Sequence, residues 1–415
     1  MAAPRLRFLF DFSCPYAYIA STQVEALAER AGAELIPQPM LLGGVFRANS
    51  TPQNLSEVLS PAKARHNLAD MHRQAERAGI ELRMHPKHPM RTVEALRALL
   101  VVGPPFMPLA HAFYRAYWVE GVDLTSEAGL RQVLSAEGHD ADAVLAKISE
   151  PAIKQELRTR TDEAIELGAF GAPACVLDTP EGTELIWGAD RLERVERMLC
   201  EASGRSFTPQ PLPTQLSAPV DIYFDYSSPF AYLGCHRAEQ LFGDHARWHP
   251  MLLGAVFKAV GMVNVPMFAQ SPAKRAYTSR DLAHQARELG ARYNFPSRFP
   301  MRSVLALRVT LAAKAHESAE GRRLVHAFFQ AYWADDRDIA DPEVVAAICD
   351  EQGFDGAALV AAAGDKPAKD ALFAETNAAV EAGVFGAPTF VVDKPEGAEL
   401  FWGVDRIDYA LRAAT

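Results

Sequence analysis

The chain contains the same long pattern twice, and this duplication limits its fold more than any other feature. The phrase FDFSCPYAY at 10–18 recurs as FDYSSPFAY at 224–232. Further pairs follow in the same order: PMLLGGVF at 39–46 with PMLLGAVF at 250–257, PMRTVEALR at 89–97 with PMRSVLALR at 300–308, and HAFYRAYW at 111–118 with HAFFQAYW at 326–333. Solenoid repeats recur every 20–50 residues or so, which excludes that architecture. The pattern predicts duplication of a whole domain.

A proline-rich stretch separates the two copies. The segment SGRSFTPQPLPTQLSAP at 203–219 contains four prolines among Ser, Thr and Gln residues. This composition is typical of an extended, semi-rigid linker. We therefore expect a first domain over 1–202 and a second over 220–415, called here the first and second repeat. A chain of 415 residues also fits two domains of about 200 residues each.

Both repeats follow the same predicted plan. An apolar strand, RLRFLFDF at 5–12 or VDIYFDY at 220–226, ends in a Cys-Pro or Ser-Pro turn that opens a helix. A second strand and a long helix-rich segment follow, and two strand-like segments with a terminal helix close the copy. The order predicts an α/β fold with a small mixed sheet and a large helical insertion in each repeat.

Charge and composition narrow the classes of partner. The formal net charge is −10. Nucleic acids and anionic membranes attract basic surfaces, so we expect neither as a partner. No segment approaches the 18 or so uninterrupted apolar residues of a membrane span. A small-molecule substrate or a protein partner is the better expectation.

The cysteines and histidines predict no metal site. His111 and His326 have no acidic or histidine partner at metal-binding spacing, so we expect them to pack in the core. Without CxxC pairs, the cysteines predict neither a zinc site nor a disulfide framework, and they suit a reducing cytoplasm. There are five of them: Cys14, Cys175, Cys200, Cys235 and Cys349.

The residue before the repeated proline is the strongest candidate for chemistry. It is Cys14 in the first repeat and Ser228 in the second. A helix N-terminus carries unpaired N–H groups and a positive dipole end, so it stabilises an anion. Ser228 can donate a hydrogen bond to an incoming thiolate and favour its ionised form. The alternative is an ordinary Ser-Pro helix start.

Cys14 has two possible roles. A cysteine at a helix N-terminus can be a stabilised thiolate, with a pKa of about 3.5–7.5. Ala17 stands where a resolving cysteine would be in a Cys-Pro-X-Cys motif, so a mixed disulfide with an external thiol is the redox reaction that remains. Alternatively, Cys14 is an inert substitute for serine.

The motifs FDYSSPFAYL, PMLLGAVFKAVG, SPAKRAY, VFGAPTFVVD and FWGVDR together resemble the family of 2-hydroxychromene-2-carboxylate isomerases and kappa-class glutathione transferases. That resemblance covers nearly the whole chain, once per repeat. It implies a thioredoxin-like fold of the disulfide-oxidase type, glutathione as cofactor, and a serine that activates the glutathione sulfur. It also implies cis prolines at Pro173 and Pro388, with Ala172 and Ala387 pairing with the glutathione peptide. An ordinary strand-start proline is the alternative.

The resemblance assigns the remaining glutathione contacts. Each pair in the WGADR and WGVDR turns would bind the glutamyl end, although charged residues at a helix start are usually caps. Near the glycyl end, Asn264 and Lys274 match family positions in the second repeat. Lys63 and either Asn54 or Asn49 are the first-repeat candidates, and Asn54 is taken here. The turn residues are Asp190, Arg191, Asp405 and Arg406. Arg91 and Arg302 either meet a substrate carboxylate or are solvated.

These assignments lead to three functional hypotheses. The first is a glutathione-dependent isomerase or transferase acting on an electrophilic, aromatic-derived carboxylate. The second is a thiol-disulfide oxidoreductase centred on Cys14 with glutathione as the resolving thiol. The third is a non-catalytic glutathione-binding scaffold. Family members pair as dimers, so the tandem chain is expected to form an intramolecular pseudo-dimer, as a monomer or a homodimer.

Overall fold

A computed structural model describes residues 3–180, 182–395 and 397–415 and shows two four-stranded mixed sheets, one in each repeat. The predicted α/β class is confirmed. Strand order is β2-β1-β3-β4 in the first sheet and β6-β5-β7-β8 in the second. The strands are β1 (Arg5–Phe10), β2 (Glu34–Pro39), β3 (Ala174–Thr179), β4 (Gly182–Trp187), β5 (Val220–Phe224), β6 (Ala246–Pro250), β7 (Thr389–Val392) and β8 (Glu399–Trp402).

The register of the central strands explains how each repeat closes. β1 pairs in parallel with β2 and antiparallel with β3, so a strand from the end of the repeat is hydrogen-bonded beside its first strand. β5 pairs with β6 and β7 in the same way. Leu6, Phe8 and Leu9 on β1 are fully buried, as expected for a central strand covered on both faces. β1 and β5 are thus inner strands of their sheets, and the Cys-Pro and Ser-Pro turns directly follow their C-terminal ends.

The helices follow the same plan in both repeats. Those of the first are α1 (Pro15–Ala31), α2 (Leu42–Ala48), α3 (Pro61–Arg77), α4 (Val93–Val102), α5 (Phe106–Trp118), α6 (Glu127–Ala136), α7 (Ala141–Lys147), α8 (Pro151–Glu166) and α9 (Leu192–Ser203). Those of the second are α10 (Pro229–Phe242), α11 (Leu253–Ala259), α12 (Pro272–Glu288), α13 (Val304–Ala312), α14 (Arg322–Trp333), α15 (Pro342–Glu351), α16 (Gly356–Ala363), α17 (Lys366–Glu381) and α18 (Ile407–Ala413).

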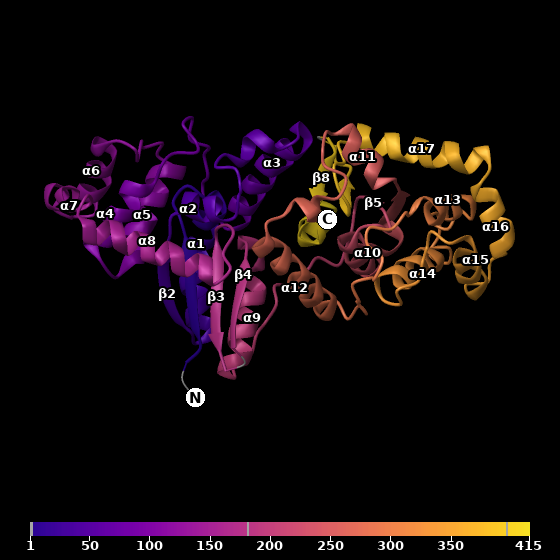
Figure 1. The fold of residues 1–415 in the computed structure, drawn as a ribbon, viewed down its shortest axis with the longest axis horizontal. Coiled ribbons are helices and arrows are strands. Elements are labelled where there is room, and N and C mark those ends of the chain that lie inside the picture. The colour runs from indigo at the N-terminus through magenta and orange to yellow at the C-terminus, as the bar shows by residue number, and fades with distance from the viewer. Residues whose placement is uncertain (1–2, 181, 396) are drawn as a thin grey trace. The chain divides into compact units, whose positions relative to one another are not determined.

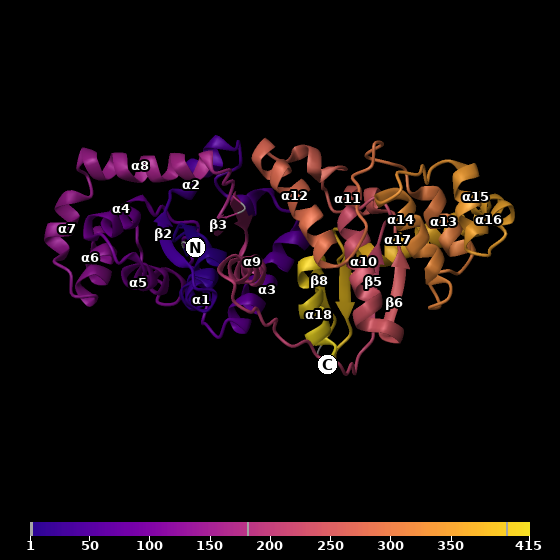
Figure 2. The same cartoon turned by 90° about the horizontal axis from the view of Figure 1, so that it is seen from below.

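The helical insertion lies to one side of each sheet. In Figure 1, α4–α8 are gathered on the β2 side of the first sheet, while α1 and α9 pack on each other. Figure 2 shows α13–α17 on the β6 side of the second sheet, with α10 and α18 beside its strands. Each sheet thus keeps its Cys-Pro or Ser-Pro turn next to its own insertion.

Contacts divide the chain into two compact units. Unit 1 comprises Met1–Val58, Leu68–Gln210 and Ser271–Ala273, and unit 2 comprises Leu59–Asn67, Pro211–Gln270 and Lys274–Thr415. The main boundary, after Gln210, falls inside the proline-rich stretch 203–219. The start of α3, however, is grouped with unit 2 although it belongs to the first repeat.

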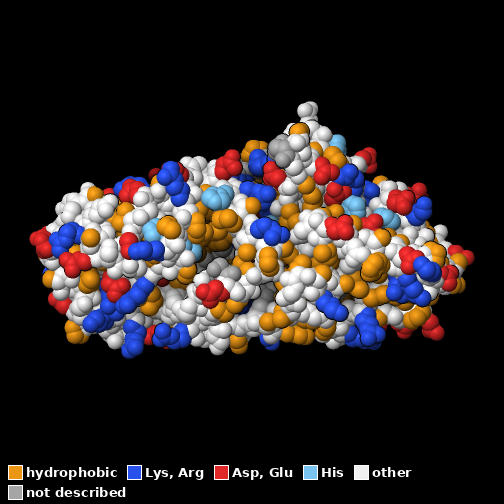
Figure 3. Space-filling view, turned by 90° about the horizontal axis from the view of Figure 1, so that it is seen from above, with side chains coloured by type: hydrophobic (Ala, Val, Ile, Leu, Met, Phe, Trp, Pro, Cys, Tyr) orange, Lys and Arg blue, Asp and Glu red, His pale blue; other side chains and the backbone are white. Residues whose placement is uncertain are grey.

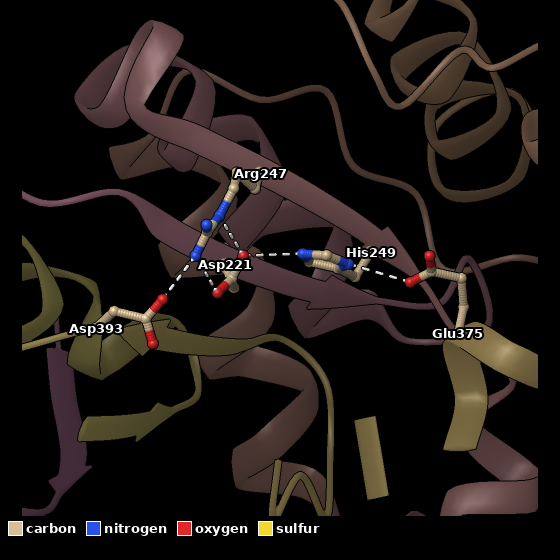
Figure 4. Close-up of polar contacts among 5 residues, drawn as sticks. All are labelled: Asp221, Arg247, His249, Glu375 and Asp393. Atoms are coloured by element: carbon tan, nitrogen blue, oxygen red, sulfur yellow. Dashed lines mark hydrogen bonds and ion pairs between the residues drawn. The ribbon is translucent and has the colours of Figure 1, made fainter. Parts of the chain in front are cut away.

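A charged network lies at one edge of the second sheet, and the residues that the structure describes at the matching edge of the first sheet do not repeat it. His249 on β6 bridges Asp221 (Nε2 to Oδ1, 2.9 Å) and Glu375 (Nδ1 to Oε2, 3.0 Å), as Figure 4 shows. Arg247 joins Asp221 at 2.6 Å to Asp393 at 2.9 Å. Burial by itself lowers the pKa of His249, but its hydrogen bonds to the two carboxylates outweigh burial and raise the pKa to about 9.

The first sheet replaces this network with simpler contacts. Arg7 on β1 donates two hydrogen bonds to Asp178, at 3.0 and 2.8 Å. Gln38, which stands at the position of His249, donates to the carbonyl of Arg160 at 3.2 Å. The two sheets therefore share a topology but differ in titratable groups at one edge.

The outer surface carries charges of both signs. On the face drawn in Figure 3, acidic and basic side chains are interspersed with hydrophobic ones. Among the residues that the structure describes, no helix combines the length and the apolar character needed to cross a membrane.

Candidate functional site

Ser228 lies at the junction of three elements in the second repeat. It is the N-cap of α10, and its Oγ accepts a hydrogen bond from the N–H of Ala231 at 3.1 Å. The same hydroxyl donates to the carbonyl oxygen of Ala387 at 3.0 Å. Ala387 precedes Pro388, and the peptide bond between them is cis, as the resemblance implied. The structure thus brings the predicted Ser-Pro turn and the predicted GAP segment into direct contact.

Cys14 occupies the same place in the first repeat with one hydrogen bond fewer. Its Sγ lies 3.1 Å from the carbonyl oxygen of Ala172, which precedes the cis Pro173. Cys14 is the N-cap residue of α1, but its side chain makes no capping hydrogen bond. The Cys14 thiol therefore contacts the GAP segment as the Ser228 hydroxyl does, but it does not accept a capping hydrogen bond from its helix.

The pKa of Cys14 is raised, whereas the sequence suggested that the helix N-terminus could lower it. Its side chain is only 7% exposed. Burial, assisted by the nearby charge of Asp11, raises the pKa of the thiol to about 12 despite the backbone N–H groups of Tyr16 and Ala17. The direction of this shift favours the second alternative, an inert substitute for serine, because desolvation outweighs the helix N-terminus.

A buried aspartate behind each turn was missed by the sequence analysis. Asp11 accepts hydrogen bonds from the N–H of Ser13 (2.9 Å), the N–H of Leu42 (2.8 Å) and the hydroxyl of Thr92 (2.6 Å). It thereby joins the turn to the starts of α2 and α4. Burial raises the pKa of Asp11, while these donors favour its ionised form.

Asp225 repeats this arrangement in the second copy. It accepts from the N–H groups of Ser227 and Leu253 at 2.9 and 2.7 Å, and from Ser303. Burial raises its pKa as well. The signal was present in the sequence, because FDFS and FDYS keep the aspartate three residues before Cys14 or Ser228 in both repeats.

The turns that contain Asp190 and Asp405 are tied to the GAP segments. The N–H of Gly403 donates to the carbonyl of Pro388 at 2.9 Å, and Gly188 donates to Pro173 at 3.0 Å. The following residues form short 3-10 helices, η2 (Ala189–Arg191) and η5 (Val404–Arg406), that lead into α9 and α18. Asp190, Arg191, Asp405 and Arg406 are therefore next to the predicted cis prolines in their own repeats.

Trp402 packs directly on the second GAP segment. A Cβ on Gly386 would lie 2.3 Å from its Nε1 atom, so only glycine fits there. Trp187 and Gly171 repeat this contact in the first copy, at 2.8 Å. The glycine of each GAP segment thus lets a tryptophan of the last strand approach the backbone beside the cis proline.

The choice of Asn54 as the counterpart of Asn264 is wrong. The stretches 39–97 and 250–308 align without a gap, which pairs Asn264 with Gln53. A Cβ on Gly254 would lie 2.9 Å from the Asn264 amide oxygen, and one on Gly43 would lie 2.8 Å from the Gln53 amide oxygen. Asn54 instead donates to Glu57 at 2.9 Å.

Asn49, the other candidate, is not at this position either. Its side-chain amide donates to the carbonyls of Val45 and Ala169 at 3.0 and 3.2 Å. It therefore links the end of α2 to the chain just before the first GAP segment. The stretches 39–97 and 250–308 have equal length, so a gap-free alignment of the two repeats identifies Gln53.

Lys63 is also placed differently from the expectation. It was assigned to the Cys14 site, but it belongs to unit 2, where its Nζ lies 4.9 Å from the ring centroid of Trp402. His66 of the same segment accepts a hydrogen bond from the N–H of Trp402 at 3.2 Å. Burial and the neighbouring Lys274 lower the pKa of Lys63 to about 8. Burial also lowers the pKa of Lys274.

The matched histidines lie at the margin of the core, each beside a glutamate, and are not fully buried, contrary to the expectation. His111 Nε2 lies 2.9 Å from a carboxylate oxygen of Glu25, and His326 Nε2 lies 3.4 Å from Glu239. Both rings are half-buried. Clusters of three or more His, Cys, Asp or Glu side chains able to hold a metal ion are absent from the described residues.

The other candidates have simple surroundings. Arg91 pairs with Glu94 at 2.8 Å, whereas Arg302 is exposed and Leu305 stands at the position of Glu94. Cys175 is buried, and burial raises its pKa to about 12. All five cysteines are free thiols and buried.

Comparisons with known proteins find relatives that are similar in sequence to about half of the chain. The 2-hydroxychromene-2-carboxylate isomerase of Sphingobium xenophagum is 27% identical over 47% of this chain and 97% of its own length. Glutathione S-transferase kappa 1 of Caenorhabditis elegans is 27% identical over 51% of this chain and 95% of its own. A solved 2-hydroxychromene-2-carboxylate isomerase is 28% identical, covers 47% of this chain and 93% of its own, and has a TM-score of 0.42.

These relatives confirm the resemblance that the motifs indicated. The model of the DSBA-like thioredoxin domain matches the chain twice, at 5–199 and at 219–413. The two matches cover both sheets and both predicted turns. The chain belongs to the DSBA-like thioredoxin domain family and carries two copies of that domain.

Proposed function

We propose that the protein is a glutathione-dependent isomerase or transferase whose thiol-activating site is the Ser228 turn. Its substrate would be an electrophilic, aromatic-derived carboxylate. The observation that carries this proposal is the position of the Ser228 hydroxyl, at the N-terminus of α10 and 3.0 Å from the carbonyl beside the cis proline. The relatives named as isomerases and glutathione transferases support the same reaction class.

The residues of the second repeat suit the charges of glutathione. Asp405 offers a carboxylate for its ammonium group, and Arg406 and Lys274 offer cations for its carboxylates. The exposed Asn264 offers an amide. Ala387 supplies a backbone beside the active turn. When bound there, glutathione would supply a thiolate nucleophile.

Ser228 would favour that thiolate by donating a hydrogen bond. Its single hydroxyl proton is directed to Ala387 in the structure, and the oxygen keeps its bond from Ala231. A hydrogen bond to an anion is stronger than one to a neutral carbonyl, so the proton would turn to a sulfur anion at this point. The N-terminus of α10 would add its positive dipole end.

The first repeat offers weaker support for thiol-disulfide chemistry. The buried Cys14 thiol, with its raised pKa, has little thiolate at neutral pH. The Ser228 repeat is therefore the proposed reaction centre. The free cysteines and the net charge of −10 support a cytoplasmic protein that acts on a small molecule.

Ultraviolet difference titration of glutathione tests the proposal. Thiolate absorbance at neutral pH is expected with the wild type and with Cys14→Ala, and it should be lost with Ser228→Ala. Thiolate that persists in Ser228→Ala would move the activating group elsewhere. Glutathione binding without any thiolate absorbance would favour the scaffold function. If Cys14→Ala still binds glutathione but loses the thiolate absorbance, the redox function is favoured.

A further inference from the structure

A matched tryptophan supports the active turn in each repeat. The indole N–H of Trp118 donates to the carbonyl of Phe12 at 2.9 Å, and that of Trp333 donates to Tyr226 at 2.8 Å. Phe12 and Tyr226 lie two residues before Cys14 and Ser228. The indole therefore connects the side chains packed on it to the backbone two residues before the turn where chemistry is proposed.

The side chains resting on the two indoles differ in polarity. In the second repeat, the Phe299 and Phe295 rings have their centroids 6.0 and 6.1 Å from that of Trp333. Phe295 and Phe268 also contact Phe299, at 5.1 and 5.9 Å, the latter edge-on at 84°. We call Phe268, Phe295 and Phe299 the phenylalanine cluster. Such tilted and edge-on pairs are the preferred geometries of aromatic rings.

The phenylalanine cluster is open to solvent. Phe268 is 55% and Phe295 is 42% exposed, although large apolar side chains are usually buried. The first repeat has Glu57, Met84 and His88 at the same positions. One copy of the domain thus keeps an exposed aromatic surface that the other copy lacks.

His88 makes the first repeat polar at this point. Its Nδ1 lies 2.8 Å from the hydroxyl of Tyr117, which accepts a hydrogen bond from the N–H of Met90 at 2.9 Å. Nδ1 and the tyrosine hydroxyl are hydrogen-bonded to each other, so Nε2 is the ring nitrogen left for another polar partner. Burial, with His85 nearby, lowers the pKa of His88 to about 4, so the ring is neutral at neutral pH. His88 thus places polar ring nitrogens where Phe299 has only a hydrocarbon ring.

We propose that the phenylalanine cluster binds the aromatic ring of the electrophile in the second repeat, and that His88 denies the first repeat an equivalent aromatic surface. Phe299 and His88 are the specificity-determining pair. This inference rests on the proposed function, because the electrophile is the substrate of that reaction. Binding of an aromatic ring to the phenylalanine cluster can nevertheless be tested without glutathione.

Binding of 2-naphthol, followed by its fluorescence, tests the cluster alone. Phe299→His is expected to weaken binding about two- to tenfold, the weight of one aromatic pair. Phe268→Ser, at an exposed position whose loss does not affect the core, should act in the same direction. His88→Phe should add or strengthen a site in the first repeat. Unchanged naphthol binding in both Phe299→His and Phe268→Ser would overturn the inference.

Two further measurements separate the remaining outcomes. Calorimetric titration compares S-benzylglutathione with glutathione; Phe299→His should lower the preference for the benzyl form and leave glutathione affinity unchanged. If neither thiol compound binds while naphthol behaves as expected, the proposed function fails and the aromatic site stands. If Phe268→Ser changes the sedimentation mass, the cluster is a contact between chains and the inference fails.

Discussion

The Cys14 turn and the Ser228 turn have nearly the same backbone but differ in what their side chains can do. Their N-cap residues have φ and ψ of −100° and 115° in the first repeat and −103° and 120° in the second. Both contact the carbonyl before a cis proline. Only the serine also caps its helix, and only the cysteine is an acid whose ionisation burial suppresses. The comparison teaches that a helix N-terminus does not by itself make a thiolate.

The largest expected effect concerns the reactivity of Cys14. With a pKa of about 12, its thiolate fraction at pH 7.5 is smaller than that of an exposed cysteine by a factor on the order of 10³. Iodoacetamide should therefore label Cys14 slowly in the folded protein and rapidly in denaturant, as read by mass spectrometry. A Ser228→Cys variant should place an equally slow thiol in the second turn. Fast labelling of Cys14 alone would show that the two turns differ in more than the side chain.

The buried aspartates should respond alike in the two repeats. Asp11→Asn or Asp225→Asn places amide N–H groups against hydrogen-bond donors, so each should lower the free energy of unfolding by about 3 kcal/mol. Thermal unfolding measures the loss. Thr92→Val and Ser303→Ala remove one donor each and serve as milder matched controls. A large loss of stability in one variant only would show that the two aspartates contribute unequally despite their shared geometry.

A pH-dependent difference should separate the sheets. The pKa of His249 is raised from its ordinary value near 6.5 to about 9. Its stabilising effect is therefore complete below pH 6.5 and is lost as the pH rises through 9. The stability difference between wild type and His249→Gln should fall by about 1–3 kcal/mol over this interval. Gln38→Ala, the matched change in the first sheet, should show no such fall, and an equal fall would contradict the role of the network.

The smallest expected effect is on helix capping. Cys14→Ser would supply a hydroxyl that accepts from the N–H of Ala17, as Ser228 accepts from Ala231. An N-cap of this kind contributes about 1 kcal/mol, so the melting temperature of the first repeat should rise by about 2–4 °C. Ser228→Cys should lower that of the second repeat by a similar amount. Changes of the same sign in both variants would show that capping is not the relevant difference.

Much of the site could be predicted because the chain presents two copies for comparison. Both Pro-containing turns, both GAP segments and the residues of the WGADR and WGVDR turns lie near each other within their own repeats. Asp11 and Asp225 were not predicted as site residues, because an acidic residue at the end of an apolar strand is usually exposed to solvent. Gln53 was missed because glutamine was not considered as a substitute for Asn264.

The sequence by itself determined the duplicated α/β plan, the strands, and the turn where Cys14 replaces Ser228, because periodicity and turn residues are local properties. Tertiary structure alone decided the protonation of Cys14, the partners of Asp11 and the placement of Lys63 on Trp402. Burial depends on everything packed around a group, and Trp402 lies hundreds of residues from Lys63 in the chain. Ionisation and long-range contact are therefore set by the folded protein, whatever the residue type suggests.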